Sequence, residues 1–351
     1  MTLMIKKDRH ISYCLIASLL MVACDRESHP ITPEEQPQEQ YAISLSASST
    51  AMTNSRAIVD SEATLQATTL GVFAYKQLAD GTKVSVFDNT EVSYDAVKGW
   101  TYTGTKYWDR TAHYYFVSYS PHQDANINFS EEGRLEINNI PNWQAIDTNS
   151  KDYVVADDHG KAEGGYITAN GVRAVPLNFK HILCQLEVRV AKNAFLTSEY
   201  TLSGISYTNV PKIGEKAKYT YLFAGKDESG AAIEEAVGTM TLGRGDVSSE
   251  AQQMAKLDNV IVPSDPDEDA STTIKHLVVP FETNENIKIT LGYKVNGTER
   301  PDAVVDTQID KLVENKRYVL TLTFNSGAEV TSSLQILDWV DEEIEEPKYN
   351  W

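Results

Sequence analysis

The sequence holds little cysteine, with only Cys14, Cys24 and Cys184 among its 351 residues. Cys14 and Cys24 both lie in the first 24 residues, so one cysteine remains for the rest of the chain. That remainder therefore has no disulfide framework, the device that stabilises many small exported domains. Cys184 lies in VPLNFKHILCQLEVRV, residues 175–190, a pattern that predicts a buried strand position. The alternative is a nucleophile paired with His181, but no third residue nearby would orient that histidine.

The familiar catalytic motifs are also missing. The sequence contains no G-x-S-x-G, H-E-x-x-H or C-x-x-C pattern and no glycine-rich phosphate loop ahead of a helix. The histidines beyond residue 23 are His29, His113, His122, His159, His181 and His276. None of them are paired at the spacing of metal ligands, so the sequence predicts no metal site and no cofactor. These absences argue against an enzyme, and we expect no catalytic residue.

The chain has neither a long hydrophobic run nor an excess of positive charge. Its apolar stretch at residues 11–23 is interrupted by Ser12 and Ser18 and is too short for a transmembrane helix. The formal net charge is −19. Removal of residues 1–23 would take away three basic side chains and one acidic side chain, which leaves −21. A surface of this charge repels phosphate backbones, so the sequence predicts no nucleic-acid partner.

The N-terminal segment does contain the pattern of an export signal. Basic residues at positions 6, 7 and 9 precede the apolar stretch, and the stretch ends in LMVAC at residues 20–24. This ending resembles the lipobox of bacterial lipoproteins, although Met21 stands where leucine is usual. We predict a lipoprotein signal peptide over residues 1–23 and lipidation of Cys24, whose acyl chains would hold the protein on the outer membrane. The alternative is an ordinary cleaved signal peptide in which Cys24 has no role.

Composition divides the remaining chain into a tether and two β-rich blocks. Residues 24–40 are rich in proline, glutamate and glutamine, which predicts a disordered tether between lipid and fold. We predict an N-terminal β-sandwich domain over residues 41–192 and a C-terminal β-sandwich domain over residues 193–351. No pattern indicates a helix long enough for a βαβ unit, so antiparallel sandwiches fit better than a parallel doubly wound sheet.

Short patterns indicate individual strands and turns. Residues 41–47 alternate larger apolar side chains with small ones, as in a half-buried strand, and residues 49–60 have a loop composition. Residues 79–82 and Asn296-Gly297 predict hairpin turns. We expect a helical turn at residues 310–315.

Aromatic residues are concentrated in GWTYTGTKYWDRTAHYYFVSYSP, residues 99–121. Alternate aromatics on strands usually face inward, which favours a role in core packing. The functional alternative is an exposed platform that binds a glycan through Trp100, Trp108 or Trp143.

The order of these segments resembles the fimbrillin family of type V pili from Bacteroidota. The resemblance rests on the lipobox, the alternating strand, a loop with an arginine, LGVFAY at residues 70–75, the aromatic block, residues 175–190 and a final ILDW. Each is a plain β-strand pattern, and their order over nearly the whole chain from Cys24 makes the match. The resemblance implies an all-β fold of two tandem transthyretin-like antiparallel sandwiches. It also implies a pilus stalk, tip or anchor subunit that is no enzyme.

The resemblance further implies how the subunit assembles. In the family, an arginine-specific protease cuts in the loop after the first strand, and Arg56, followed by Ala57, matches that position. The strand that carries Tyr41, Ile43 and Leu45 would leave with the lipid, and another subunit's strand would fill its groove. The alternative for Arg56 is an ordinary exposed loop arginine.

The sequence is compatible with two donor strands and with a second function. Residues 333–340 would make a better donor strand than the glutamate-rich residues 341–351, but they could equally be the last core strand. The alternative function is that of a permanently lipid-anchored outer-membrane protein that binds a glycan or another host ligand.

Overall fold

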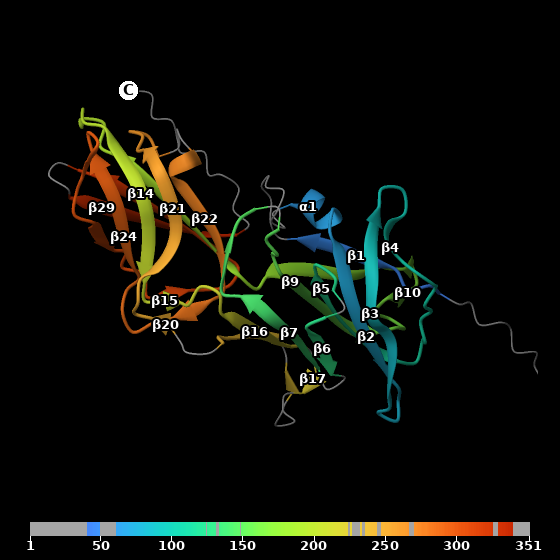
Figure 1. Cartoon of the computed structure of the whole chain (residues 1–351). Helices are drawn as coiled ribbons and strands as arrows, with labels where there is room; N and C mark the ends of the chain where they lie inside the picture. The colour runs from blue at the N-terminus through green and yellow to red at the C-terminus, as the bar shows by residue number, and fades with distance from the viewer. Residues whose placement is uncertain are drawn as a thin grey trace, which may run out of the picture. The chain divides into compact units, whose positions relative to one another are not determined.

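The computed structural model describes residues 41–49 and 61–339, without residues 124, 131–132, 148, 224, 227–231, 234–235, 244–246, 267–269 and 326–328. Nearly every element in these residues is a β-strand (Figure 1). The helical elements described are α1 (Glu62–Gln66) and the 3₁₀ turn η1 (Ala270–Thr272). The all-β prediction is therefore confirmed. No helix among the described residues has the length and apolar character needed to cross a membrane.

A seven-stranded sheet contains most of the N-terminal strands. Its strands, in spatial order, are β1 (Leu45–Ser49), β12 (Val175–His181), β9 (Val154–Lys161), β5 (His113–Ser120), β2 (Thr69–Gln77), β3 (Lys83–Asp95) and β4 (Gly99–Tyr102). The two ends of the sheet approach each other, because β1 contacts β4 and Ala42 forms an isolated bridge with Tyr107. The sheet thus curls around its own apolar face, which we call the first core.

A four-stranded sheet covers the opposite face of the central strands β2, β5 and β9. Its order is β19 (Val237–Thr241), β16 (Lys216–Leu222), β7 (Arg134–Pro141) and β6 (Ile127–Ser130). Phe73, Val117 and Tyr119 from the seven-stranded sheet pack there with Leu135 and Tyr219 from the four-stranded sheet. This second core is continuous and almost fully buried, so both faces of β2 and β5 are covered.

Two five-stranded sheets enclose a third core. One has the order β29 (Val330–Asp338), β28 (Lys316–Phe324), β13 (Cys184–Lys192), β22 (Thr273–Val278) and β8 (Trp143–Ala145). The other contains β21 (Gln252–Ile261), β14 (Tyr200–Thr208), β24 (Lys288–Val295), β25 (Thr298–Glu299) and β26 (Ala303–Asp306). Leu202, Leu291, Val188 and Leu320 come from both sheets and are completely buried in this core. Such facing of two apolar sheet surfaces is the packing of a β-sandwich.

Short two-stranded ladders complete the fold. They are β10 (Ile167–Thr168) with β11 (Gly171–Val172), β15 (Val210–Pro211) with β20 (Val247–Ser248), β17 (Gly225–Lys226) with β18 (Ala232–Ile233), and β23 (Phe281–Glu282) with β27 (Lys311–Leu312). The last pair corrects one sequence prediction, because residues 310–315 form no helical turn. Leu312 is buried and pairs with Phe281, so long-range pairing decides the conformation there.

Both predicted hairpin turns are confirmed. Asn296 and Gly297 link β24 to β25 with φ values of 49° and 76°, the left-handed conformation that a type I′ turn requires at both positions. Residues 79–82 link β2 to β3.

Two ladders depart from the expected antiparallel pairing. β1 runs parallel to β12, and β13 runs parallel to β28. β13 precedes residue 193 yet pairs with β22 and β28, which follow it. The domain division at residue 193 stays a prediction.

His276 on β22 gives the third core a sensitivity to acid. Its side chain is buried, its ring lies edge-on to Trp143, and its Nδ1 has no hydrogen-bond partner among the described residues. Burial lowers the pKa of His276 from 6.5 to about 4. Between about pH 4 and pH 6.5, the imidazole of His276 is therefore protonated in the unfolded chain and neutral in the folded chain.

We expect the free energy of unfolding to fall as the pH drops from about 6.5 to 4, with His276 contributing a loss of about 3 kcal/mol at pH 4. His276→Gln removes this titration, so the difference between variant and wild type should change with pH in that window. Urea unfolding at several pH values measures it. Wild-type and variant curves that stay parallel from pH 7 to pH 4 would contradict the assignment.

Candidate functional site

Residues 41–49 lie between β12 and the connection from β4 to β5, and they hydrogen-bond to both. On one side β1 pairs with β12, with Leu45 opposite Val175. On the other side the backbone of residues 41–43 bonds to residues 106–108. There the Ile43 N–H donates to the Lys106 carbonyl at 2.8 Å, and the Trp108 N–H donates to the Tyr41 carbonyl at 2.9 Å. The segment thus occupies a groove, which we call the strand groove.

The side chains of this segment alternate in burial as the sequence predicted. Ile43 and Leu45 are 3% and 5% exposed and point into the first core, whereas Ala42, Ser44 and Ser46 are exposed. Each buried aliphatic side chain contributes about 1.5–3 kcal/mol relative to an exposed one. The regular strand begins at Leu45, later than expected, because the preceding residues bond to the other wall of the groove.

The apolar wall of the groove comes from β12 and α1. Val175, Leu177 and Phe179 alternate inward along β12 and are completely buried. Leu65, the buried residue of α1, packs in the same core. The side chain of Ser61 caps this helix by accepting a bond from the Thr64 N–H at 3.1 Å. The short helix is thereby fixed where it contacts β1.

Few side-chain contacts are specific to the segment. The Tyr102 hydroxyl donates to the Ile43 carbonyl at 2.6 Å, and burial raises the pKa of that tyrosine. The Ser48 hydroxyl donates to Asn178 Oδ1 at 2.7 Å on the exposed side. The Ser46 hydroxyl also donates to the Val175 carbonyl at 3.3 Å, and the Arg110 guanidinium lies 5.9 Å from the centroid of the Tyr41 ring. The backbone bonds and alternate apolar side chains are contacts that another strand with apolar residues at the same spacing would reproduce.

A bulge in β3 helps the sheet to curl toward the strand groove. Val72 pairs with Thr90 and Ala74 with Phe87, which leaves an extra residue in β3, and Asn89 takes a left-handed φ of 42°. Bulges bend a strand and increase its local twist. β4, the strand that follows β3, contacts β1 at the strand groove.

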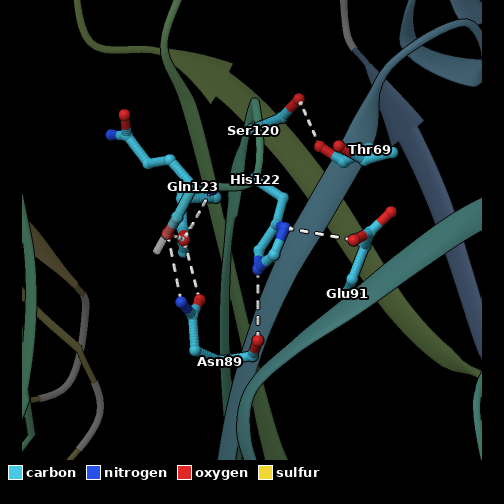
Figure 2. A network of polar contacts seen from close by, with 7 residues as sticks. Thr69, Asn89, Glu91, Ser120, His122 and Gln123 are labelled. Atoms are coloured by element: carbon cyan, nitrogen blue, oxygen red, sulfur yellow. Dashed lines mark hydrogen bonds and ion pairs between the residues drawn. The ribbon is translucent and has the colours of Figure 1, made fainter. Parts of the chain in front are cut away.

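Side chains near the end of β5 hold this bulge in place (Figure 2). Asn89 Oδ1 accepts from the Tyr119 hydroxyl at 2.7 Å, and Asn89 Nδ2 donates to the Gln123 carbonyl at 3.1 Å. His122 Nε2 lies 3.2 Å from the Asn89 carbonyl, and its Nδ1 lies 3.5 Å from Glu91 Oε2. These contacts hold Asn89 within the bulge and Glu91 just after it, so we regard the network as a support of the bulge.

Of the three tryptophans proposed as a glycan platform, Trp100 and Trp108 pack with the first core and Trp143 packs in the third. Trp108 is 6% exposed and stacks on Tyr166 in the first core. Trp143 is 9% exposed in the third core, where its Nε1 donates to the Pro211 carbonyl at 2.7 Å. Trp100 is half-buried on β4. These positions agree with core packing.

Cys184 is a free, buried cysteine, as expected for a core strand. Its Sγ donates to the Val278 carbonyl at 3.2 Å, and burial raises its pKa far above the ordinary value. His181 bonds instead to Asp152, with Nδ1 3.0 Å from the carboxylate, and its ring stacks on Trp339. The structure therefore does not pair Cys184 with His181.

Residues 333–340 belong largely to β29, which pairs with β28 at the edge of its sheet. Leu334 and Leu337 are half-buried, whereas Ile336 is 56% exposed. Trp339, just beyond the strand, is buried in the second core. β29 is thus part of this chain's own fold here.

The predicted lipidation site Cys24 and the predicted cleavage positions Arg56 and Ala57 lie outside the described residues, as do residues 341–351. The sequence analysis did not predict that residues 175–179 form the wall of the groove. The alternation in VPLNF at these residues matches that of residues 41–47 and is the pattern that indicates this wall.

A family model described as fimbrillin-like matches residues 55–339. The chain belongs to the fimbrillin-like family. This membership supports the assignment of the protein as a fimbrial or cell-adhesion subunit at the cell surface, where such subunits assemble with other pilin subunits. The membership agrees with the resemblance found in the sequence. The family is one of structural subunits and is not known for enzymes. No curated protein matches the chain.

Several solved structures are similar to this fimbrillin-like chain in fold. A fimbrial protein from Bacteroides vulgatus is 15% identical, with a TM-score of 0.49 over 85% of this chain and 99% of the other. A candidate cell adhesion protein from Bacteroides uniformis is 18% identical, with a TM-score of 0.48 over 87% and 100%. The tip fimbrial protein Mfa3 from Porphyromonas gingivalis is 10% identical, with a TM-score of 0.45 over 86% and 100%.

Proposed function

We propose that this fimbrillin-like protein is a pilus subunit that reaches the outer membrane as a lipoprotein and polymerises by strand exchange. In this proposal Cys24 carries the lipid and a protease cuts between Arg56 and Ala57. The strand with Tyr41, Ile43 and Leu45 then leaves, and a strand from another subunit takes its place. In this proposal the lipidated precursor resides on the outer membrane, and the cleaved subunit functions in the fimbrium.

The observation that carries the proposal is the way residues 41–49 sit in the strand groove. They make backbone bonds on both sides and contribute buried side chains at alternate positions, while most of their polar side chains face outward. Binding of an incoming strand at a sheet edge uses the same two kinds of contact. An empty groove would expose unpaired backbone and the apolar wall at Val175, Leu177 and Phe179, a hazard for aggregation. Cleavage and insertion should therefore be coupled.

The glycan-binding alternative receives less support. Trp108 and Trp143 are buried among core residues, so neither offers an open ring face to a sugar. A host receptor for the assembled fimbria is compatible with the proposal but has no assigned site.

Arg56→Ala should abolish polymerisation while leaving secretion intact, because the protease loses its cleavage point. Arg26→Ala is the matched control, since a cut there would leave the strand on the subunit. Pili from cells that express each variant are analysed for boiling-resistant ladders and for the N-terminus of the subunit. We expect Ala57 as the N-terminus in wild type and in the control. Ladders from Arg56→Ala, or a subunit that retains residues 41–49 in pili, would refute strand exchange.

Lipid attachment is tested separately by replacing Cys24 with Ser. The variant should lose labelling by radioactive palmitate and should leave the membrane fraction. Retained label on the variant would refute the assignment of Cys24 without bearing on the strand groove.

A further inference from the structure

His113 and His159 are distant in sequence, but the sheet brings their rings together. They lie on the adjacent central strands β5 and β9, where Tyr115 pairs with His159 and His113 pairs with Lys161. His113 Nε2 lies 3.4 Å from His159 Nδ1; His113 is half-buried and His159 is exposed. Sequence spacing gave no sign of this pair, because antiparallel pairing places residues that are 46 positions apart next to each other.

The separation of the two nitrogens suits a metal ion better than a direct hydrogen bond. A donor–acceptor distance of 3.4 Å is beyond the usual range of N–H hydrogen bonds, so direct attraction between the rings is weak. Two imidazole nitrogens bound to one tetrahedral zinc ion at about 2.0–2.1 Å each lie roughly 3.3–3.4 Å apart. The ring centroids lie 5.7 Å apart and the ring planes differ by 24°.

The rigidity of the surroundings favours the same role. The Tyr115 ring packs against both histidines, with centroid distances of 4.7 Å to His113 and 5.8 Å to His159. Strands in the centre of a sheet hold such side chains more precisely than loops do.

Charges around the pair act in opposite directions. Lys161 is exposed beside His113 and repels a cation. The net charge of −19 makes the overall field of the chain attractive to cations. No group of three or more histidine, cysteine, aspartate or glutamate side chains suited to a metal occurs among the described residues. A site at this pair would therefore have two protein ligands and complete its coordination with water.

We propose that His113 Nε2 and His159 Nδ1 form a surface site for one divalent late transition-metal ion, Zn²⁺ or Cu²⁺. Each histidine would carry its remaining proton on the other ring nitrogen, Nδ1 of His113 and Nε2 of His159. Copper should bind more tightly than zinc, in keeping with the general order for nitrogen ligands. This site is separate from the strand groove, and the proposal does not depend on strand exchange.

Calorimetric titration of the purified protein with Zn²⁺ tests the proposal, together with electron paramagnetic resonance after addition of Cu²⁺. Wild type should bind one equivalent that is absent from both His113→Asn and His159→Asn, and the copper spectrum should show coupling to two nitrogens. Each variant should weaken binding by more than about tenfold, since even the outer partners of metal ligands contribute 10–100-fold. His29→Asn controls for metal held by the N-terminal region.

Lys161→Ala provides a variant that should gain affinity. Removal of this exposed positive charge should tighten zinc binding by about two- to fivefold, the size of a screened surface interaction. Circular dichroism checks that each variant keeps its β-sheet spectrum. The proposal fails if folded His113→Asn and His159→Asn bind zinc as wild type does, or if wild type shows no saturable equivalent.

Discussion

Leu45→Asp is expected to lower the free energy of unfolding by about 4 kcal/mol or more, because the substitution removes a buried side chain and places a carboxylate in the first core. Leu45 is 5% exposed in the middle of the strand groove. Denaturation in urea, followed by tryptophan fluorescence, measures the change. Trp108, a neighbour in the first core, reports on this region directly.

Ser44→Asp is the matched control for this experiment. Ser44 precedes Leu45 on the same segment, but its side chain is exposed, so its change should stay within about 0.5 kcal/mol. Equal effects of the two substitutions would mean that residues 41–49 do not hold the register seen here. A large effect of Leu45→Asp alone would establish that the segment stabilises the precursor, which strand exchange requires.

Trp339→Ala should cost about 3–5 kcal/mol of stability, the usual range for truncating a buried large aromatic side chain. Trp339 is 6% exposed, and its ring stacks on His181 with centroids 4.0 Å apart and planes within 9°. Its loss leaves a cavity beside the His181–Asp152 pair, which has almost no exposure. Thermal and urea unfolding both measure the cost.

Ile336→Ala is the control. Ile336 lies on β29, the strand that Trp339 directly follows, and 56% of its side chain is exposed, so its truncation should change stability little. A negligible effect of Trp339→Ala would mean that the end of β29 is not anchored in the second core. The subunit could then release this segment easily. A large effect would mean that release of β29 requires another interaction to replace the buried tryptophan.

Local patterns predicted those features that depend on neighbouring residues alone. The turn at Asn296-Gly297 follows from the backbone freedom of these two residues. The alternation in residues 41–47 was enough to predict which side chains are buried. Cys184 could be assigned to a core strand for the same reason.

Features that depend on distant pairing could not be predicted in this way. The partner of β1 is β12, which lies about 130 residues later and runs parallel, and nothing in either segment alone specifies that choice. Residues 310–315 failed as a helical turn because Phe281 pairs with Leu312. The contact between His113 and His159 depends on the register of two long strands, which only the assembled sheet determines.

The parallel ladder between β1 and β12 gives the edge of this sheet a direction. Backbone donors and acceptors are spaced differently for parallel and antiparallel neighbours, so an incoming strand can reproduce these bonds only when it runs the same way as β12. Under the proposed exchange, every subunit would then join its neighbour in one orientation. Contacts of that kind are head-to-tail and do not close on themselves in pairs, so they extend into a filament whose two ends differ.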